Sequence, residues 1–357
     1  MRRALLLVFI VCLAPPVGAS DWTVAPAGSL QHDYGRYHLG DDSGTQSAPR
    51  RTRLALRADH RSGFKIRLEW DFIAGTVTDA YVEIPAGSTQ WRLGQFKQPF
   101  TLEEPGSSKE MALLERSQVH DAFSIPRRMG VMWITPLRNA TLQISAFGGT
   151  AEEPSAATGL AARVYGHPAG HQNLHLGFAL AQERRSDDLL RLRARPENRL
   201  LPFTPADTGR RIEADANRRI GVEAAWLRGP LSVQGEIAAL RGSGSNSLSG
   251  EGAYVQASWL TDGAARSFRD GAVRGPKLES GRYPVEFSAR VSRVDFDLGS
   301  RHLVAQTLYS IGASTFIGRY VRISLEQNWI TAERSSALSR TGEFDGDVTT
   351  ARLQLSF

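Results

Sequence analysis

Arginine dominates the residues of this sequence that could bind a ligand. The chain has 357 residues and 43 basic residues, and only Lys65, Lys97, Lys109 and Lys277 are lysine, so 39 are arginine. A guanidinium group stays charged and offers a planar fork of donors that matches carboxylate and phosphate oxygens. With a formal net charge of +6, this composition favours recognition of anions. The alternative is a solvated basic surface without a ligand.

No pattern for covalent catalysis or metal binding stands out. The sequence shows no ordered set of Ser, His and Asp, no glycine-rich phosphate loop and no paired-carboxylate motif. His167, His171 and His175 recur every four residues, a spacing that suits a metal ion on a helix, but Pro168 and Gly170 interrupt the run. We therefore predict no catalytic residue, no metal site and no cofactor.

The elements that must position the arginines follow a period of two. Over residues 64–72, apolar residues alternate with charged ones such as Lys65, Arg67 and Glu69. Successive side chains of a strand point to opposite faces, so one face is apolar and the other is charged. The pattern recurs in segments of about ten residues up to the terminal Phe357, which is typical of a membrane barrel between lipid and a wet lumen.

Sixteen such segments are predicted, an even number, as a bacterial barrel with both termini in the periplasm requires. The predicted fold class is all-β, a transmembrane antiparallel β-barrel. The strands are expected at 28–38, 50–60, 63–73, 76–85, 89–96, 128–136, 139–148, 159–167, 172–182, 217–228, 230–241, 252–262, 283–294, 303–316, 320–331 and 347–357.

The links between these segments alternate in length, as short periplasmic turns and longer external loops should. Long external loops are predicted at 39–49, 97–127, 149–158, 183–216, 242–251 and 332–346. Two links depart from the alternation. The external link at 74–75 is a tight turn, and the periplasmic link at 263–282 holds about twenty residues rich in arginine.

The N-terminus has the composition of a signal peptide over residues 1–19. Arg2 and Arg3 precede an apolar run at 4–13, which is too short to span a bilayer as a helix, and residues 17–19 are small enough for cleavage. A soluble N-terminal helix is the alternative. Residues 20–357 then form a single barrel domain in the bacterial outer membrane.

That compartment sets the expected partners. Lipid and the phosphates of lipopolysaccharide are available to the arginines, whereas a secreted protein has little reason to meet nucleic acid. The one cysteine, Cys12, lies in the apolar run before the cleavage site, so the mature chain has no disulfide framework.

Strand parity places a set of basic side chains in the lumen. A ring of basic residues replaces part of an anion's hydration shell and still releases the ion, so these side chains are predicted to line a pore for anions. The alternative for each arginine is a salt bridge with a lumen carboxylate that braces the wall. The predicted residues are Arg51, Arg53, Arg57, Lys65, Arg67, Arg92, Arg128, Arg290, Arg322 and Arg352.

Several motifs, in order, resemble the phosphate-selective porin family. These are Gly94-Gln95-Phe96-Lys97 with Pro99-Phe100, then Ser107-Ser108, Glu115-Arg116-Ser117 and Gly130-Val131, followed by shorter matches such as Gly221-Val222-Glu223. The resemblance covers nearly the whole chain. It implies an anion-preferring, sixteen-stranded, trimeric porin.

The resemblance also implies two inward folds. The long third loop, 97–127, would fold into the lumen as a constriction, with Lys97, Lys109 and Arg116 in or beside it. The link at 263–282 would be an inward-folded periplasmic turn, which accounts for its length.

The constriction loop departs from a purely basic character, because it carries Glu103, Glu104, Glu110, Glu115 and Asp121. We therefore predict a water-filled pore for passive diffusion of small hydrophilic solutes, with a weak preference for inorganic or organic anions such as phosphate. The alternatives are a hydrolase on an outer-membrane barrel and a secreted structural or adhesive β-protein.

Overall fold

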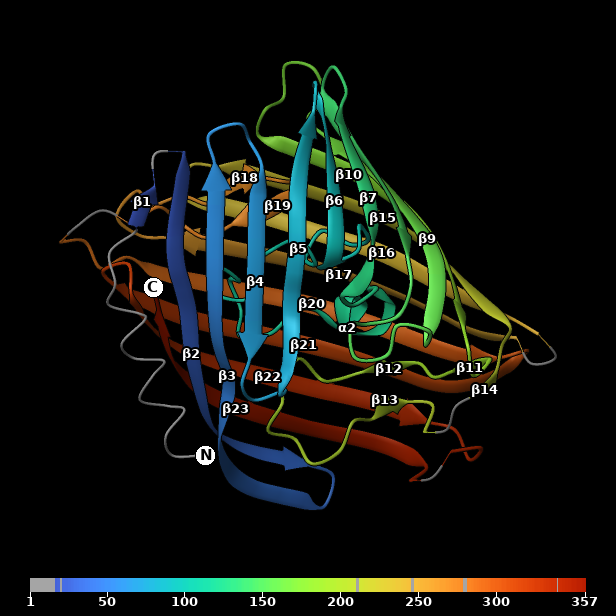
Figure 1. Ribbon diagram of the computed structural model, residues 1–357. Coiled ribbons are helices and arrows are strands. Elements are labelled where there is room, and N and C mark those ends of the chain that lie inside the picture. Colours follow the sequence, from blue (N-terminus) through green and yellow to red (C-terminus); the bar gives the residue numbers. More distant parts are fainter. Residues whose placement is uncertain (1–16, 20, 210–211, 245–246, 279–280, 339) are drawn as a thin grey trace.

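One antiparallel sheet closes on itself to form a barrel, which Figure 1 shows for the computed structural model of the chain. The structure describes residues 17–19, 21–209, 212–244, 247–278, 281–338 and 340–357. The sheet has seventeen strands, of which β1 (Val17–Ala19) pairs with β2 and takes no part in the closure. The other sixteen confirm the predicted number.

The closing pair is the first and the last of these sixteen strands. They run antiparallel from Ser29 opposite Ser356 to Leu39 opposite Gly346. The barrel strands are β2 (Trp22–Leu39), β3 (Asp42–His60), β4 (Lys65–Asp71), β5 (Thr76–Ala86), β6 (Thr89–Phe96), β7 (Arg128–Pro136), β8 (Ala140–Phe147), β9 (Ala157–Gly166), β10 (Leu174–Arg185), β15 (Ala216–Arg228), β16 (Leu231–Ser243), β17 (Leu248–Leu260), β20 (Val285–Leu298), β21 (Arg301–Ile317), β22 (Val321–Arg334) and β23 (Gly342–Ser356).

The period of two in the sequence becomes the inside and the outside of the barrel. On β4 the outward side chains Ile66, Leu68 and Trp70 are 39, 48 and 40 % exposed on the apolar outer surface. Lys65 and Arg67, which alternate with them, face the lumen, where each pairs with a carboxylate. An outer surface of this kind is stable only against lipid.

Two predicted external loops are instead continuations of strands. β2 and β3 stay paired until Leu39 lies opposite Asp42, and β16 and β17 leave only residues 244–247 between them, so the loops predicted at 39–49 and 242–251 are wrong in extent. The residues of β3 from Asp42 to Ser47 are polar on both faces. A strand with water on both sides shows no apolar alternation, so the sequence pattern hides it.

The predicted tight turn at 74–75 is present between β4 and β5. The Asp71 carboxylate accepts hydrogen bonds from the backbone N–H groups of Ile73 and Ala74, at 3.0 and 3.2 Å. Gly75 adopts a φ of 70°, which a residue without a β-carbon enters at little cost.

Three segments between strands turn into the barrel, where Figure 1 shows α2 and β12 behind the front wall. The first, 97–127, contains the helix α2 (Gln118–Phe123). The second, 186–215, contains β11 (Leu189–Leu190), β12 (Arg193–Ala194), β13 (Ala206–Asp207) and β14 (Ile212–Glu213). The third, 261–284, contains β18 (Ser267–Arg269) and β19 (Ala272–Arg274). The described part of the chain contains no helix that is long and apolar enough to cross a membrane.

The first two segments build an apolar core inside the lumen. Phe123 of α2 meets Phe296 of β20 edge to face at 6.3 Å between ring centroids. Phe100, Leu192 and Val304 belong to the same buried cluster. Inward positions of β20 and β21 thus carry large apolar residues, which packing requires and a solvated wall would not. The segment 183–216 was predicted only as an external loop, so its part in this core is a difference from the prediction.

Candidate pore site

A polar cavity lies between the β4–β9 wall and the start of the segment 97–127. Its volume is about 330 Å³. Six cationic and three acidic side chains line it. The cations are Lys65, Arg67, Arg92, Lys97, Arg163 and Arg274, and the acids are Asp79, Glu83 and Asp270. We refer to this space as the cationic cavity.

Glu83 organises the cations of β4 and β6. It accepts from Arg92 Nε at 2.9 Å, lies 3.3 Å from Lys65 Nζ and also binds the amide of Gln90. The Glu83 side chain is 7 % exposed, whereas those of Arg92 and Lys65 are 21 and 40 % exposed. The acid therefore lies behind two cations that face the cavity, and their charge is only partly compensated there.

Lys97 follows β6 directly and marks the start of the inward segment. Its ammonium donates to the backbone carbonyl of Gly106 at 2.7 Å. Burial, together with the charges of Arg116 and Arg127, lowers the pKa of Lys97 to about 7 against the attraction of Glu104. The charge of this lysine therefore changes near neutral pH.

Two arginines of the cavity were not among the predicted site residues. Arg163 of β9 lies with its guanidinium 4.7 Å from the Tyr165 ring and pairs with Glu223 at 2.6 Å. Arg274 of β19 contacts Glu110 and Asp270 at 3.5 and 3.3 Å. Both were hard to find because β9 alternates weakly and the inward turn gives no strand parity.

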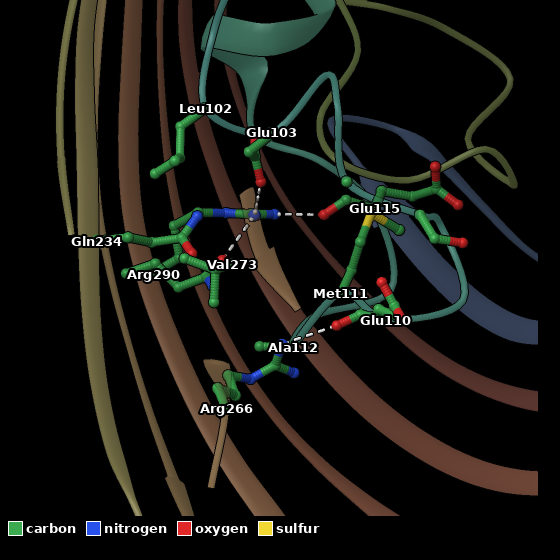
Figure 2. Close-up of a pocket in the computed structure, with 13 residues that line it drawn as sticks. Leu102, Glu103, Glu110, Met111, Ala112, Glu115, Gln234, Arg266, Val273 and Arg290 are labelled. Atoms are coloured by element: carbon green, nitrogen blue, oxygen red, sulfur yellow. Dashed lines mark hydrogen bonds and ion pairs between the residues drawn. The ribbon is translucent and has the colours of Figure 1, made fainter. Parts of the chain in front are cut away.

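On the opposite wall, Arg290 of β20 forms ion pairs and hydrogen bonds with several residues of the inward segments (Figure 2). Its Nη2 donates to Glu197 at 2.5 Å and to the backbone carbonyl of Glu115 at 3.0 Å, and Nη1 lies 3.7 Å from Glu103. The space beside it has a volume of only about 30 Å³, room for about one water molecule. Arg290 therefore braces the inward segments.

Arg352 of β23 and Arg51 of β3 share the carboxylate of Glu115. Arg352 donates to Glu115 at 2.7 Å and to both oxygens of Asp33, and Arg51 donates to Glu115 at 2.8 Å. Both side chains are about 5 % exposed or less. These two predicted pore residues lie in the lumen, in a buried ion-pair network.

Arg50 joins the same carboxylate through an irregularity that strand parity cannot reveal. The pairing of β2 with β3 shifts between Gln31 and His32, and Arg50 is the residue left out of the register. This β-bulge turns Arg50 inward, where Nη2 lies 2.7 Å from Glu115.

Three more predicted arginines also brace the wall. Arg322 donates to the backbone carbonyls of Met111 and Ala112 in the inward segment. Arg128 pairs with Glu183 at 2.8 Å. Arg53 pairs with Asp71 at 2.7 Å and Glu69 at 3.4 Å.

The three remaining predicted residues differ in their contacts and exposure. Lys109 donates to the Gly28 carbonyl at 3.3 Å. Arg116 donates to the backbone carbonyls of Glu103 and Gly106, and so holds the inward segment to itself. Arg57 is exposed on an inward position of β3.

Most carboxylates of the segment 97–127 form hydrogen bonds or ion pairs with other residues of the barrel. Glu103 accepts from the Ser117 hydroxyl and backbone N–H, at 2.7 and 2.9 Å. For Glu104, burial acts to raise the pKa, but the His120 hydrogen bond and nearby cations outweigh it and hold the pKa well below its ordinary value. Of the segment's acids, none is among the residues that line the cationic cavity.

A row of arginines in the second inward segment was also missed. Leu190, Leu192 and Ala194 point into the apolar core, and the arginines between and after them, Arg191, Arg193 and Arg195, have side chains that are 42, 40 and 30 % exposed. The signal was present in the sequence as a period of two inside a predicted loop. We refer to these three residues as the arginine row.

The histidines form no cluster with other metal ligands among the described residues. His175 is buried, with Nε2 2.8 Å from Glu223. Phe268 of β18 lies over the rings of His167 and His175, at 5.0 and 5.5 Å between centroids. These contacts hold the inward turn 261–284 against the β9–β10 wall.

Comparison with known proteins decides the family. The family model described as phosphate-selective porin O and P matches residues 24–357. The chain belongs to this family. The predicted family is thereby confirmed, and with it a porin channel of the bacterial outer membrane. No curated protein matches the sequence.

Solved porin-like barrels share the fold of this porin at low sequence identity. Outer-membrane-expressed OmpT of Vibrio cholerae has a TM-score of 0.67 at 11 % identity, with 96 % of this chain and 100 % of that chain covered. The anion-selective porin from Comamonas acidovorans has 0.63 at 12 %, covering 94 and 100 %. The channel DcaP of Acinetobacter baumannii has 0.62 at 11 %, covering 97 and 100 %. This likeness confirms the predicted barrel.

Proposed function

We propose that this porin lets small hydrophilic anions diffuse through the cationic cavity and catalyses no covalent chemistry. The observation that carries the proposal is the lining of six cations against three acids, with the carboxylates of 97–127 turned elsewhere. The arginine row at the second inward segment raises the local concentration of anions before they enter. Of the predicted site residues, Lys65, Arg67, Arg92 and Lys97 serve the solute directly, and 97–127 is the constriction.

The preference for phosphate over other anions is weak in this proposal. Specific phosphate binding uses guanidinium forks with free donors. Arg163 and Arg92 already donate to Glu223 and Glu83, so neither offers an unoccupied fork. Phosphate therefore permeates without blocking the current of chloride.

Reversal potential in a planar bilayer under a KCl gradient tests the anion preference. The wild-type porin is expected to favour chloride over potassium. Arg92→Gln lowers this preference several-fold because it removes a partly exposed cation from the cavity wall. Arg57→Gln removes the same charge from an exposed lumen position outside the cavity lining and is the matched control. A potassium-selective wild-type channel contradicts the proposal.

We also propose that the porin is a homotrimer in which neighbouring subunits cover the β4–β9 wall, which we call the short wall. β4 has seven residues, a length of about 23 Å, and a tilt of about 40° leaves a height of about 18 Å. The apolar band of an outer-membrane barrel is about 25 Å tall, so lipid alone covers this wall poorly. Elsewhere the outer surface contacts lipid and lipopolysaccharide.

The oligomer is tested by the mass of the detergent-solubilised protein. Trp91 and Trp133 form an outward pair at 6.5 Å on the short wall, and Trp133→Arg is expected to yield monomers. Val255→Arg on the outward face of β17 is the control. The wall of β15–β22, which we call the long wall, faces lipid and lies outside the proposed contact between subunits. Monomeric wild-type protein under mild extraction overturns the trimer.

A further inference from the structure

The cationic cavity contains an apolar floor that a pore for small hydrated ions does not need. Ile134 of β7 faces the lumen half-buried, and Met132 lies two positions before it, fully buried against the cavity. Lumen-facing neighbours on the adjacent strands are Arg92 and Gln143, as strand register dictates. Two consecutive inward positions of β7 thus break the polar character of the wall.

Aromatic rings continue this floor on both sides. Tyr81 lies 4.7 Å below the Arg92 guanidinium and Phe96 lies 5.7 Å from it. Beyond Ile134 and Gln143, the next strand brings Arg163 with the ring of Tyr165. Arg92 and Arg163 therefore each lie over an aromatic face, and the lining between the two stacks contains the apolar Ile134 next to Gln143.

The cations above this floor keep donors available. Within the part of the chain that the structure describes, Arg92 uses Nε and Nη2 for Glu83, and its Nη1 makes no hydrogen bond. Lys65 is the most exposed cation held by Glu83, at 40 % of its side chain. One carboxylate can bind between Lys65 and Arg92 without displacing Glu83.

The size of the cavity favours a ligand larger than an inorganic ion. A volume of about 330 Å³ holds about ten water molecules and falls in the range of sites for organic molecules. Phosphate or chloride would fill a small part of it and would gain nothing from Ile134, Tyr81 or Phe96. An anion that carries an apolar ring could bury that ring on Ile134.

We infer that the cationic cavity is a binding site for organic anions in which a carboxylate is attached to a flat apolar ring. The carboxylate lies at Lys65 and Arg92, and the ring lies on Ile134 beside Tyr81. This inference rests on the proposed anion channel and names the class of solute that the channel retains longest.

Block of the KCl current in planar bilayers by benzoate, with acetate as the probe that lacks the ring, tests the site. Benzoate is expected to reduce the current at a concentration about tenfold lower than acetate, the effect of burying part of one ring. Equal block by the two probes overturns the inference. The chloride preference in KCl alone is measured beside it, so a failed benzoate site and a failed anion channel are separate results.

A matched pair of variants locates the ring. Ile134→Val and Ile134→Thr have side chains of the same size and differ in a methyl and a hydroxyl group. The threonine variant is expected to need several-fold more benzoate for half block than the valine variant, with acetate block and the KCl reversal potential unchanged. Identical benzoate block in the two variants, each with normal KCl conductance, overturns the placement of the ring on β7.

Discussion

The two walls of the barrel use basic side chains in opposite ways. On the short wall, Arg92 and Lys65 keep a fifth to two fifths of their side chains exposed and face an open cavity. On the long wall and at the closure, Arg290 and Arg352 are at most 4 % exposed and donate to carboxylates and loop carbonyls. All four lie on inward positions of their strands.

The difference comes from what each wall faces. Inward segments fill the lumen in front of β20–β23, and their backbone carbonyls and acids must be satisfied there. At the short wall the cationic cavity separates the lumen side of β4 and β6 from the inward segments, so Lys65 and Arg92 face open space. An arginine therefore braces the fold where a loop lies against it and serves the solute where water does.

The largest effect is expected on stability, from Arg290→Met. The change leaves Glu197 as a buried carboxylate without its cation, a loss of about 3–5 kcal/mol in comparable buried pairs. The heat-modifiable gel mobility of the barrel should convert at a clearly lower temperature. Arg92→Met, from the other wall, should convert near the wild-type temperature.

A double variant shows whether the loss of stability in Arg290→Met comes from the unpaired charge of Glu197 or from lost packing. Arg290→Met combined with Glu197→Gln removes both charges and should recover much of the lost stability. If Arg290→Met alone matches the wild type, Arg290 does not brace the inward segments, and the contrast between the walls fails.

The sequence predicted the side of the wall on which each arginine lies, but not its role. Alternation along β4 or β22 suffices to assign Arg67 and Arg322 to the lumen, because the outward face must be apolar. Whether such a guanidinium meets water depends on segments far away in the sequence. Met111, which follows β6 by fifteen residues, supplies the carbonyl that occupies Arg322.

Two parts of the site escaped prediction for separate physical reasons. Arg50 turns inward at a β-bulge, which a strict period of two assigns to the wrong face. Glu197 reaches Arg290 from a segment whose inward fold depends on an apolar core assembled from several loops. The predicted signal peptide, residues 1–19, lies mostly outside the described residues and stays a prediction.

A smaller effect is expected from the arginine row, which acts at a distance. Arg193→Gln with Arg195→Gln should reduce anion conductance about twofold in 0.1 M salt and hardly at all in 1 M salt, because the screening length falls from about 10 to 3 Å. Single-channel conductance over a salt series measures it. Arg218→Gln with Arg241→Gln on the outward face removes the same charge and should leave the series unchanged.

The salt series of this variant decides whether an exposed arginine contributes to anion conductance when it lies outside the cationic cavity. Arg193 pairs with Asp207 at 3.3 Å and is still 40 % exposed, so it lies between the two types of wall. If the double variant of the arginine row has the same conductance as the wild type at every salt concentration, the cationic cavity alone selects anions.

The smallest effect is a pH dependence at Lys97, where the inward segment 97–127 leaves β6 of the short wall. Its pKa is lowered to about 7 in the folded protein, so the ammonium is charged below that pH and neutral above it. Because Lys97 loses its positive charge as the pH rises from 6 to 8, the preference of the channel for anions should fall over this range. Reversal potential at fixed KCl gradient measures the change.

Two variants of Lys97 show whether this residue is the source of the pH dependence. Lys97→Met carries no charge and should remove the pH dependence, with a low anion preference throughout. Lys97→Arg stays charged across the range and should keep the preference high and flat. A slope that persists in Lys97→Met would assign the titration to another group of the inward segment 97–127. Selectivity would then depend on the braced interior of 97–127 and not on a cation in the cavity.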